Sequence, residues 1–87
     1  MIGAAQIRAA RALLGINQRE LSKIAEVATS TLKRIELAEE PTGSARTLWK
    51  LQTALEKAGV EFIPDDNVKG PGVRLKESIH SKTPRKR

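Results

Sequence analysis

Four polar side chains between residues 29 and 34 have the types and the spacing needed to hydrogen-bond the edges of nucleobases. They are Thr29, Ser30, Lys33 and Arg34. On a helix these positions share one face, opposite Leu32 and Ile35. An arginine can donate two hydrogen bonds to guanine O6 and N7, and a hydroxyl can bond several bases. The alternative interpretation is a polar helix face that is only solvated.

The apolar residues from position 18 to position 37 predict two short helices that cross steeply over a shared core. These apolar residues are Leu21, Ala25, Val27, Leu32 and Ile35. Asn17 and Glu20 are spaced as in a capping box, so the first helix should start at Gln18 and run to about Ala25. The second should cover about residues 29–37. This pattern indicates a helix-turn-helix whose second helix has an outer face free to enter a DNA groove.

Two more helices are expected around this pair. Residues 4–14 are rich in alanine with one apolar stripe, and Gly15 suits the position just after a helix. Ser44 suits the N-cap of a fourth helix, which should end at Gly59. In that helix Trp49 falls just off the apolar stripe, as either a half-buried packing residue or an anchor in a subunit contact.

A change of pattern after residue 59 predicts a small β-hairpin with strands at 60–63 and 73–76. Two strands alone are marginal in water, so the hairpin should pack on a helix or pair with another chain. The fold class expected is therefore all-α, with four helices and a short C-terminal hairpin. Its parts are a helix-turn-helix domain at 1–59, a hairpin extension at 60–76 and a disordered basic tail at 77–87.

The net charge of +6 is concentrated near the C-terminus. Residues 1–68 carry nine basic and nine acidic side chains, whereas residues 69–87 carry seven basic side chains against Glu77 alone. Overall charge is therefore poor support for nucleic-acid binding by the folded body, and the placement of individual charges must carry that inference. The chain has no cysteine, which suits a reducing cytoplasm, and we expect no signal peptide or membrane span.

No group of residues predicts catalysis. The chain lacks cysteine, and its one histidine, His80, falls in the expected tail with no partner in the sequence. The run Gly-Pro-Gly at 70–72 suits a turn and not a phosphate cradle. We therefore expect no enzymatic activity, no metal and no cofactor.

Residues 7–36, IRAARALLGINQRELSKIAEVATSTLKRIE, resemble the Cro and phage-repressor type of helix-turn-helix regulator, also called the XRE family. The resemblance covers roughly residues 5–60, and the later AGVEFI and GPGVRL segments resemble a subgroup of short bacterial regulators. Three residues depart from the usual pattern. Ser22 replaces a small alanine, and Ala28 stands where a capping Ser or Thr is common. Glu26 replaces a turn glycine, at a cost of about 1 kcal/mol if the position needs positive φ.

The resemblance implies a lambda-repressor-like fold and sequence-specific binding of double-stranded DNA by a transcriptional regulator, with repression as the expected outcome. It also implies a homodimer on a palindromic operator, with the second motif helix in the major groove. The implied base contacts are Thr29, Ser30, Lys33 and Arg34. The implied phosphate contacts are Asn17, Gln18, Lys23 and Arg46. Arg11 and Glu36 are implied as a partly buried ion pair between the first helix and the recognition helix.

Two other functions stay open at this stage. A DNA-binding antitoxin, or a controller of a phage switch, would use the same fold, and the antitoxin would also bind a toxin protein. A protein-interaction module that has lost DNA binding is compatible with the balanced charge of residues 1–68.

Overall fold

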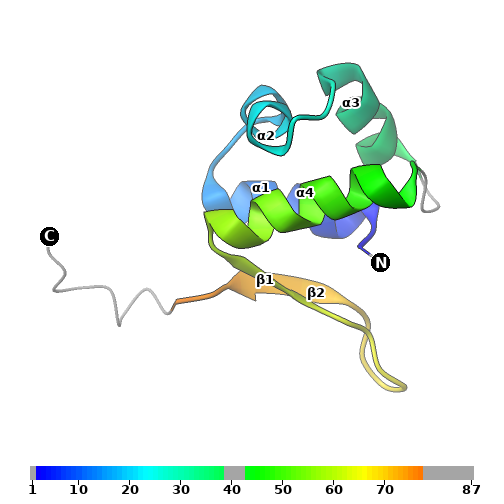
Figure 1. The fold of residues 1–87 in the computed structure, drawn as a ribbon. Helices are drawn as coiled ribbons and strands as arrows, with labels where there is room; N and C mark the ends of the chain where they lie inside the picture. Colours follow the sequence, from blue (N-terminus) through cyan, green and yellow to red (C-terminus); the bar gives the residue numbers. More distant parts are fainter. Residues whose placement is uncertain (1, 39–42, 78–87) are drawn as a thin grey trace, which may run out of the picture.

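Four helices and one two-stranded antiparallel sheet form the part of the chain that the computed structural model describes, residues 2–38 and 43–77 (Figure 1). The elements are α1 (Ala4–Leu14), α2 (Gln18–Ala25), α3 (Thr29–Leu37), α4 (Ala45–Ala58), β1 (Val60–Ile63) and β2 (Gly72–Leu75). The expected fold class is confirmed. None of the described helices is long and apolar enough to cross a membrane.

The ends of the helices follow from local capping chemistry. Asn17 Oδ1 accepts the Glu20 N–H at 2.7 Å, and Glu20 Oε1 accepts the Asn17 N–H at 2.8 Å, which completes the expected capping box at the start of α2. Ser44 Oγ accepts the Thr47 N–H at 3.1 Å and caps α4. Gly15 and Gly59, with φ of 72° and 126°, end α1 and α4 in a backbone conformation that favours glycine.

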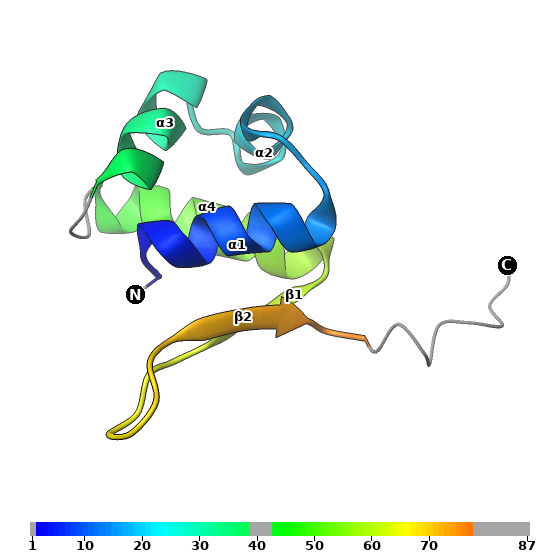
Figure 2. The ribbon, with the colours of Figure 1, turned by 180° about the vertical axis from the view of Figure 1, so that it is seen from behind.

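The core lies between three layers. α1 and α4 run side by side, with α2 and α3 on one side of them and the hairpin on the other (Figures 1 and 2). The largest fully buried side chains come from all of these layers: Ile7, Leu21, Leu32, Leu51, Leu55 and Val60. Burying one such side chain contributes roughly 1.5–3 kcal/mol. Packing of this kind is what holds α2 and α3, which are too short to be stable alone.

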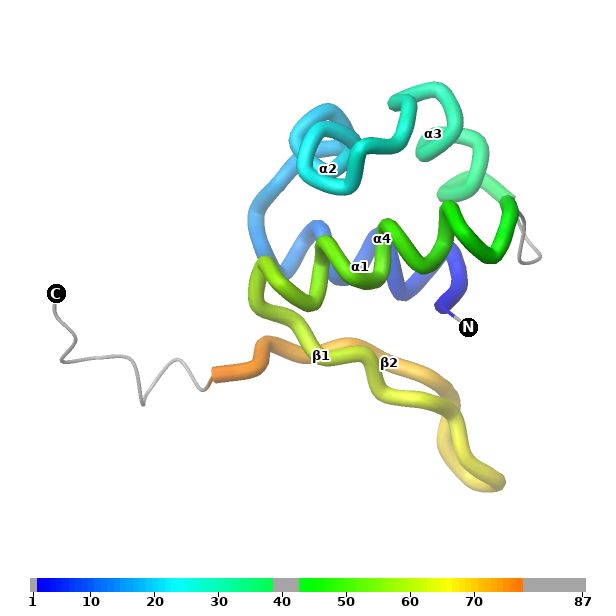
Figure 3. Tube along the Cα trace, in the orientation of Figure 1, coloured from blue at the N-terminus to red at the C-terminus, as the bar shows by residue number. Residues whose placement is uncertain are grey.

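The hairpin packs against the helices, which is one of the two outcomes expected for it. The chain runs from α4 directly into β1 beneath it (Figure 3), and Val60 is fully buried. The second strand was expected at residues 73–76, but it covers Gly72–Leu75, so that expectation is wrong by one residue. The reason is the register: Ile63, the last residue before Pro64, pairs with Gly72, and Val60 pairs with Leu75.

Trp49 is exposed and not half-buried as a packing residue would be. Its exposed fraction is 64 %, while its neighbour Leu48 is buried. The apolar stripe of α4 is formed by Leu48, Leu51 and Leu55, and the indole falls outside it. The first of the two expectations for Trp49 is therefore wrong, and the second, a subunit contact, stays a prediction. His80 and the expected basic tail from residue 78 onward lie outside the described residues.

Candidate nucleic-acid interface

The outer face of α3 presents polar side chains, and its inner face is buried. Ser30, Lys33 and Arg34 are exposed and Thr29 is partly exposed. Leu32 and Ile35 point into the core. Within residues 2–38 and 43–77, the side chains of Lys33 and Arg34 form no hydrogen bond or ion pair. The cationic donors on this face are therefore free to bind a ligand.

The turn between α2 and α3 contains two of the three sequence departures. Glu26 adopts φ 59° and ψ 46°, the left-handed conformation that costs a non-glycine residue about 1 kcal/mol. Ala28 is the N-cap of α3 and provides no side-chain hydrogen bond, so the helix begins at Thr29 as expected. The first N–H groups of α3 therefore lack a side-chain cap, and they lie at the end of the helix that carries Thr29 and Ser30.

Glu36 ties α3 to both helices that precede it. Arg11 donates from Nε to Glu36 Oε2 and from Nη2 to Oε1, each at 2.8 Å, so the expected ion pair is present. Gln18 Nε2 also donates to Oε1, at 3.0 Å. The hydrogen bonds that Arg11 donates to the Glu36 carboxylate raise the pKa of the Arg11 guanidinium. Arg8 of α1 donates to the Glu36 carbonyl oxygen. This network fixes the orientation of α3 against α1 and α2.

The match to known families agrees with this geometry. A family model described as helix-turn-helix, of the XRE type, matches residues 7–62, which is more than half of the chain. The chain belongs to the XRE-type helix-turn-helix family. It is therefore a DNA-binding helix-turn-helix regulator, and α2 and α3 are the two helices of its motif. A search of curated proteins gave no match.

The four side chains expected to contact phosphate do not form one cluster in this XRE-type protein. Asn17 and Gln18 lie together at the start of α2, where Asn17 Oδ1 acts as the cap and one amide hydrogen of Gln18 is bonded to Glu36. The second amide hydrogen and the backbone N–H of Gln18 stay available for an anion. Lys23 is exposed in the last turn of α2, and Arg46 is exposed in the first turn of α4, outside the motif.

Two contacts within the motif do not follow from the sequence: the bond from Gln18 to Glu36 and a contact between two hydroxyl groups. Ser22 Oγ lies 2.8 Å from Thr29 Oγ1 and also donates to the Arg19 carbonyl oxygen at 2.9 Å. From the sequence, Ser22 is only a small residue in place of alanine. The signal that was available is a pair of hydroxyl residues seven apart, one on each helix of the motif. The contact links a buried residue of α2 to a residue on the candidate DNA-binding face.

Proposed function

We propose that this regulator recognises a specific duplex sequence by placing α3 in the major groove, and that it represses transcription at the sites it occupies. The observation that carries the proposal is the outer face of α3, where Lys33 and Arg34 are exposed and have no partner in the described residues. Helices of this motif dock in the major groove through the N-terminal part of the second helix. Repression needs only occupancy, because a bound protein excludes polymerase from the same DNA.

Each side chain on this face has a distinct chemical task. Arg34 is suited to two parallel hydrogen bonds to a guanine, worth about 1–3 kcal/mol of discrimination against other bases. Lys33 supplies a single flexible cation for a guanine or a phosphate. Ser30 supplies a hydroxyl that both donates and accepts. Gln18, with Asn17, Lys23 and Arg46, would fix the register by binding phosphate oxygens.

Selection of bound duplexes from a random pool tests the proposed sequence recognition. The wild-type protein should enrich one motif. Arg34→Ala should relax the preference at one position per half-site by about 1–3 kcal/mol, whereas Gln18→Ala should weaken all sites alike. Arg74→Ala is the matched control: it removes the same charge from an exposed position on β2 and should leave the motif unchanged. Failure of the wild type to enrich any motif would contradict the proposal, as would an unchanged motif in Arg34→Ala.

We further propose that the protein acts as a two-fold dimer and that β2 supplies the contact. Lys76 N–H bonds the Gly59 carbonyl oxygen at 2.9 Å, which extends the strand register by one pair. Since bonded and non-bonded pairs alternate in an antiparallel ladder, the polar backbone groups of Val73 and Leu75 point away from β1. These groups lie at the free edge of β2, where a second copy can add a strand.

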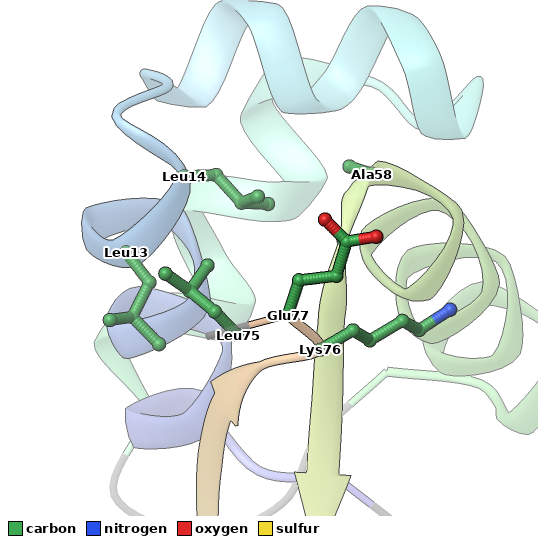
Figure 4. Close-up of a pocket in the computed structure, with 7 residues that line it drawn as sticks. Leu13, Leu14, Ala58, Leu75, Lys76 and Glu77 are labelled. Atoms are coloured by element: carbon green, nitrogen blue, oxygen red, sulfur yellow. The ribbon is translucent and has the colours of Figure 1, made fainter. Parts of the chain in front are cut away.

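The opposite edge of the hairpin is much less suitable. On β1 the same alternation directs the backbone groups of Val60 and Phe62 outward, but Val60 is fully buried. Pro64, directly after β1, has no N–H to donate. At the C-terminal end of β2, in contrast, lies an open groove of about 620 Å³ that includes the exposed side chain of Leu13 together with Leu14 and Leu75 (Figure 4). A partner strand at this edge would also cover these leucines.

The mass of the protein across a concentration series tests the dimer. The wild type should reach dimer mass in the micromolar range. Leu13→Glu should shift the equilibrium towards monomer, because it places a charge in an apolar contact. Val68→Glu changes an equally apolar and still more exposed side chain in the hairpin loop and should have no effect. A wild-type protein that stays monomeric up to high micromolar concentration would rule out this dimer without affecting the assignment of α3.

A further inference from the structure

The hydroxyl pair of Ser22 and Thr29 bears on which bases the protein prefers. We infer that Ser22 holds the hydroxyl proton of Thr29 inside the motif, so that Thr29 faces the major groove as a hydrogen-bond acceptor only. Thr29 then selects adenine or cytosine at one position of each half-site. The inference rests on the proposed docking of α3 and adds to it a rule for one base position.

The count of protons at the contact leads to this assignment. A hydroxyl has one proton to donate and two lone pairs to accept with. The Arg19 carbonyl oxygen can only accept, so the proton of Ser22 is used in the 2.9 Å bond to it. The 2.8 Å contact between Ser22 Oγ and Thr29 Oγ1 still needs a proton, which then comes from Thr29. Both lone pairs of Thr29 Oγ1 stay unused in this arrangement.

Burial keeps the hydroxyl pair in one orientation. Ser22 has an exposed fraction of only 7 %, so water has little access and cannot easily replace either of the two hydrogen bonds of its hydroxyl. Thr29 is partly exposed and is the first residue of α3, at the end of the helix that enters the groove in this motif. Ser22 therefore fixes the position of the Thr29 oxygen from within the protein. The solvent-exposed side of that oxygen would face the DNA.

A hydroxyl whose proton is already bonded can only accept hydrogen bonds, so it discriminates among bases in the major groove. The exocyclic amino groups of adenine N6 and cytosine N4 donate there, whereas guanine O6 and thymine O4 accept. Thr29 would accept a hydrogen bond from adenine or cytosine. Opposite guanine or thymine, two acceptor oxygens would face each other without a hydrogen bond. Ser30, the next residue, is exposed, and its side chain forms no hydrogen bond within the described residues, so its hydroxyl can rotate to suit either class of base.

The test is the same duplex selection, applied to Ser22→Ala, Thr29→Val and the double variant. Wild type should favour adenine or cytosine over guanine and thymine by about tenfold at one position per half-site. Ser22→Ala frees the Thr29 proton, so the ratio should fall below about threefold while the other positions of the motif keep theirs. Thr29→Val removes the acceptor and should abolish the preference. Adding Ser22→Ala to Thr29→Val should then change nothing further.

Thr53→Ala is the control, since it removes a partly exposed hydroxyl from α4, outside the motif, and it should leave the adenine-or-cytosine preference intact. Thermal unfolding should show that Ser22→Ala is folded, because the substitution deletes a donor and an acceptor together and leaves no buried group unpaired. If Ser22→Ala retains the full preference while the wild type still selects a motif, the inference is overturned and the proposed function stands. If the wild type selects no motif, the proposed function fails first.

Discussion

Replacing Glu36 with alanine is expected to lower the free energy of unfolding by about 2–4 kcal/mol. The substitution deletes the acceptor of three hydrogen bonds, two from Arg11 and one from Gln18. Removing one partner of a fully buried ion pair costs about 3–5 kcal/mol, because the remaining charge is left without compensation. The side chain of Arg11 keeps an exposed fraction of 21 %. Water can therefore screen part of the charge of Arg11, so the expected loss of stability is smaller than the value of about 5 kcal/mol at the top of the range for a fully buried pair.

The first strand of the hairpin, β1, offers a matched control for this prediction. Glu61→Ala breaks the ion pair between Glu61 and Arg74, which joins the two strands of the hairpin. Both of its side chains are well exposed, so the expected loss is below about 1 kcal/mol. Denaturant unfolding of the two variants should separate them clearly. Equal losses would mean that Glu36 does not stabilise the fold through Arg11 and Gln18.

The same substitution should also weaken DNA binding through the position of α3. Glu36 lies one turn from Lys33 on a helix that it anchors to α1 and α2. Without that anchor α3 keeps its apolar face, the bond from Arg8 to the carbonyl oxygen of residue 36 and the contact between Ser22 and Thr29. Its position is then less tightly fixed, and small displacements of a binding residue are costly to recognition. The loss should affect all duplexes alike, since the Glu36 side chain is buried and is not expected to reach a base. Arg34→Ala, in contrast, should alter the sequence preference.

The sequence predicted the helices well because their ends are encoded locally. The capping pair Asn17 and Glu20, the cap Ser44 and the two terminal glycines Gly15 and Gly59 each act within one turn of the chain. The second strand was displaced by one residue because its limits depend on pairing with β1, which is not a local property. The exposure of Trp49 depends equally on which elements pack beside α4.

The candidate site could be predicted only in its outline. The polar face of α3 follows from helical periodicity around Leu32 and Ile35, and the structure has the same face. The bond from Gln18 to Glu36 and the contact between Ser22 and Thr29 join different helices. Such contacts require the crossing geometry of α2 and α3, which no spacing within one helix specifies. The sequence thus predicts which side chains would face DNA, but not which of their hydrogen-bond donors are already bonded within the protein.

Leu32→Ala is expected to cost about 2–5 kcal/mol of stability, the range found when a buried leucine is truncated and leaves a cavity. Leu32 is fully buried and joins the recognition helix to the core. Small domains have total stabilities at the low end of about 5–15 kcal/mol, so the variant should be partly unfolded at ordinary assay temperatures. Its apparent affinity for DNA should fall in proportion to the folded fraction, because α3 cannot form alone.

The same substitution on the outer side of α3 separates packing from helix propensity. Leu37→Ala makes an identical change at a side chain that is 84 % exposed, and its effect should stay within about 0.5 kcal/mol. At a temperature where Leu32→Ala is folded, the Leu32→Ala protein should select the same duplex motif as the wild type, since the Leu32 side chain faces the core and not the groove. A changed motif would mean that the face assigned to DNA is wrong. Equal losses from both substitutions would mean that α3 is not held by its inner face.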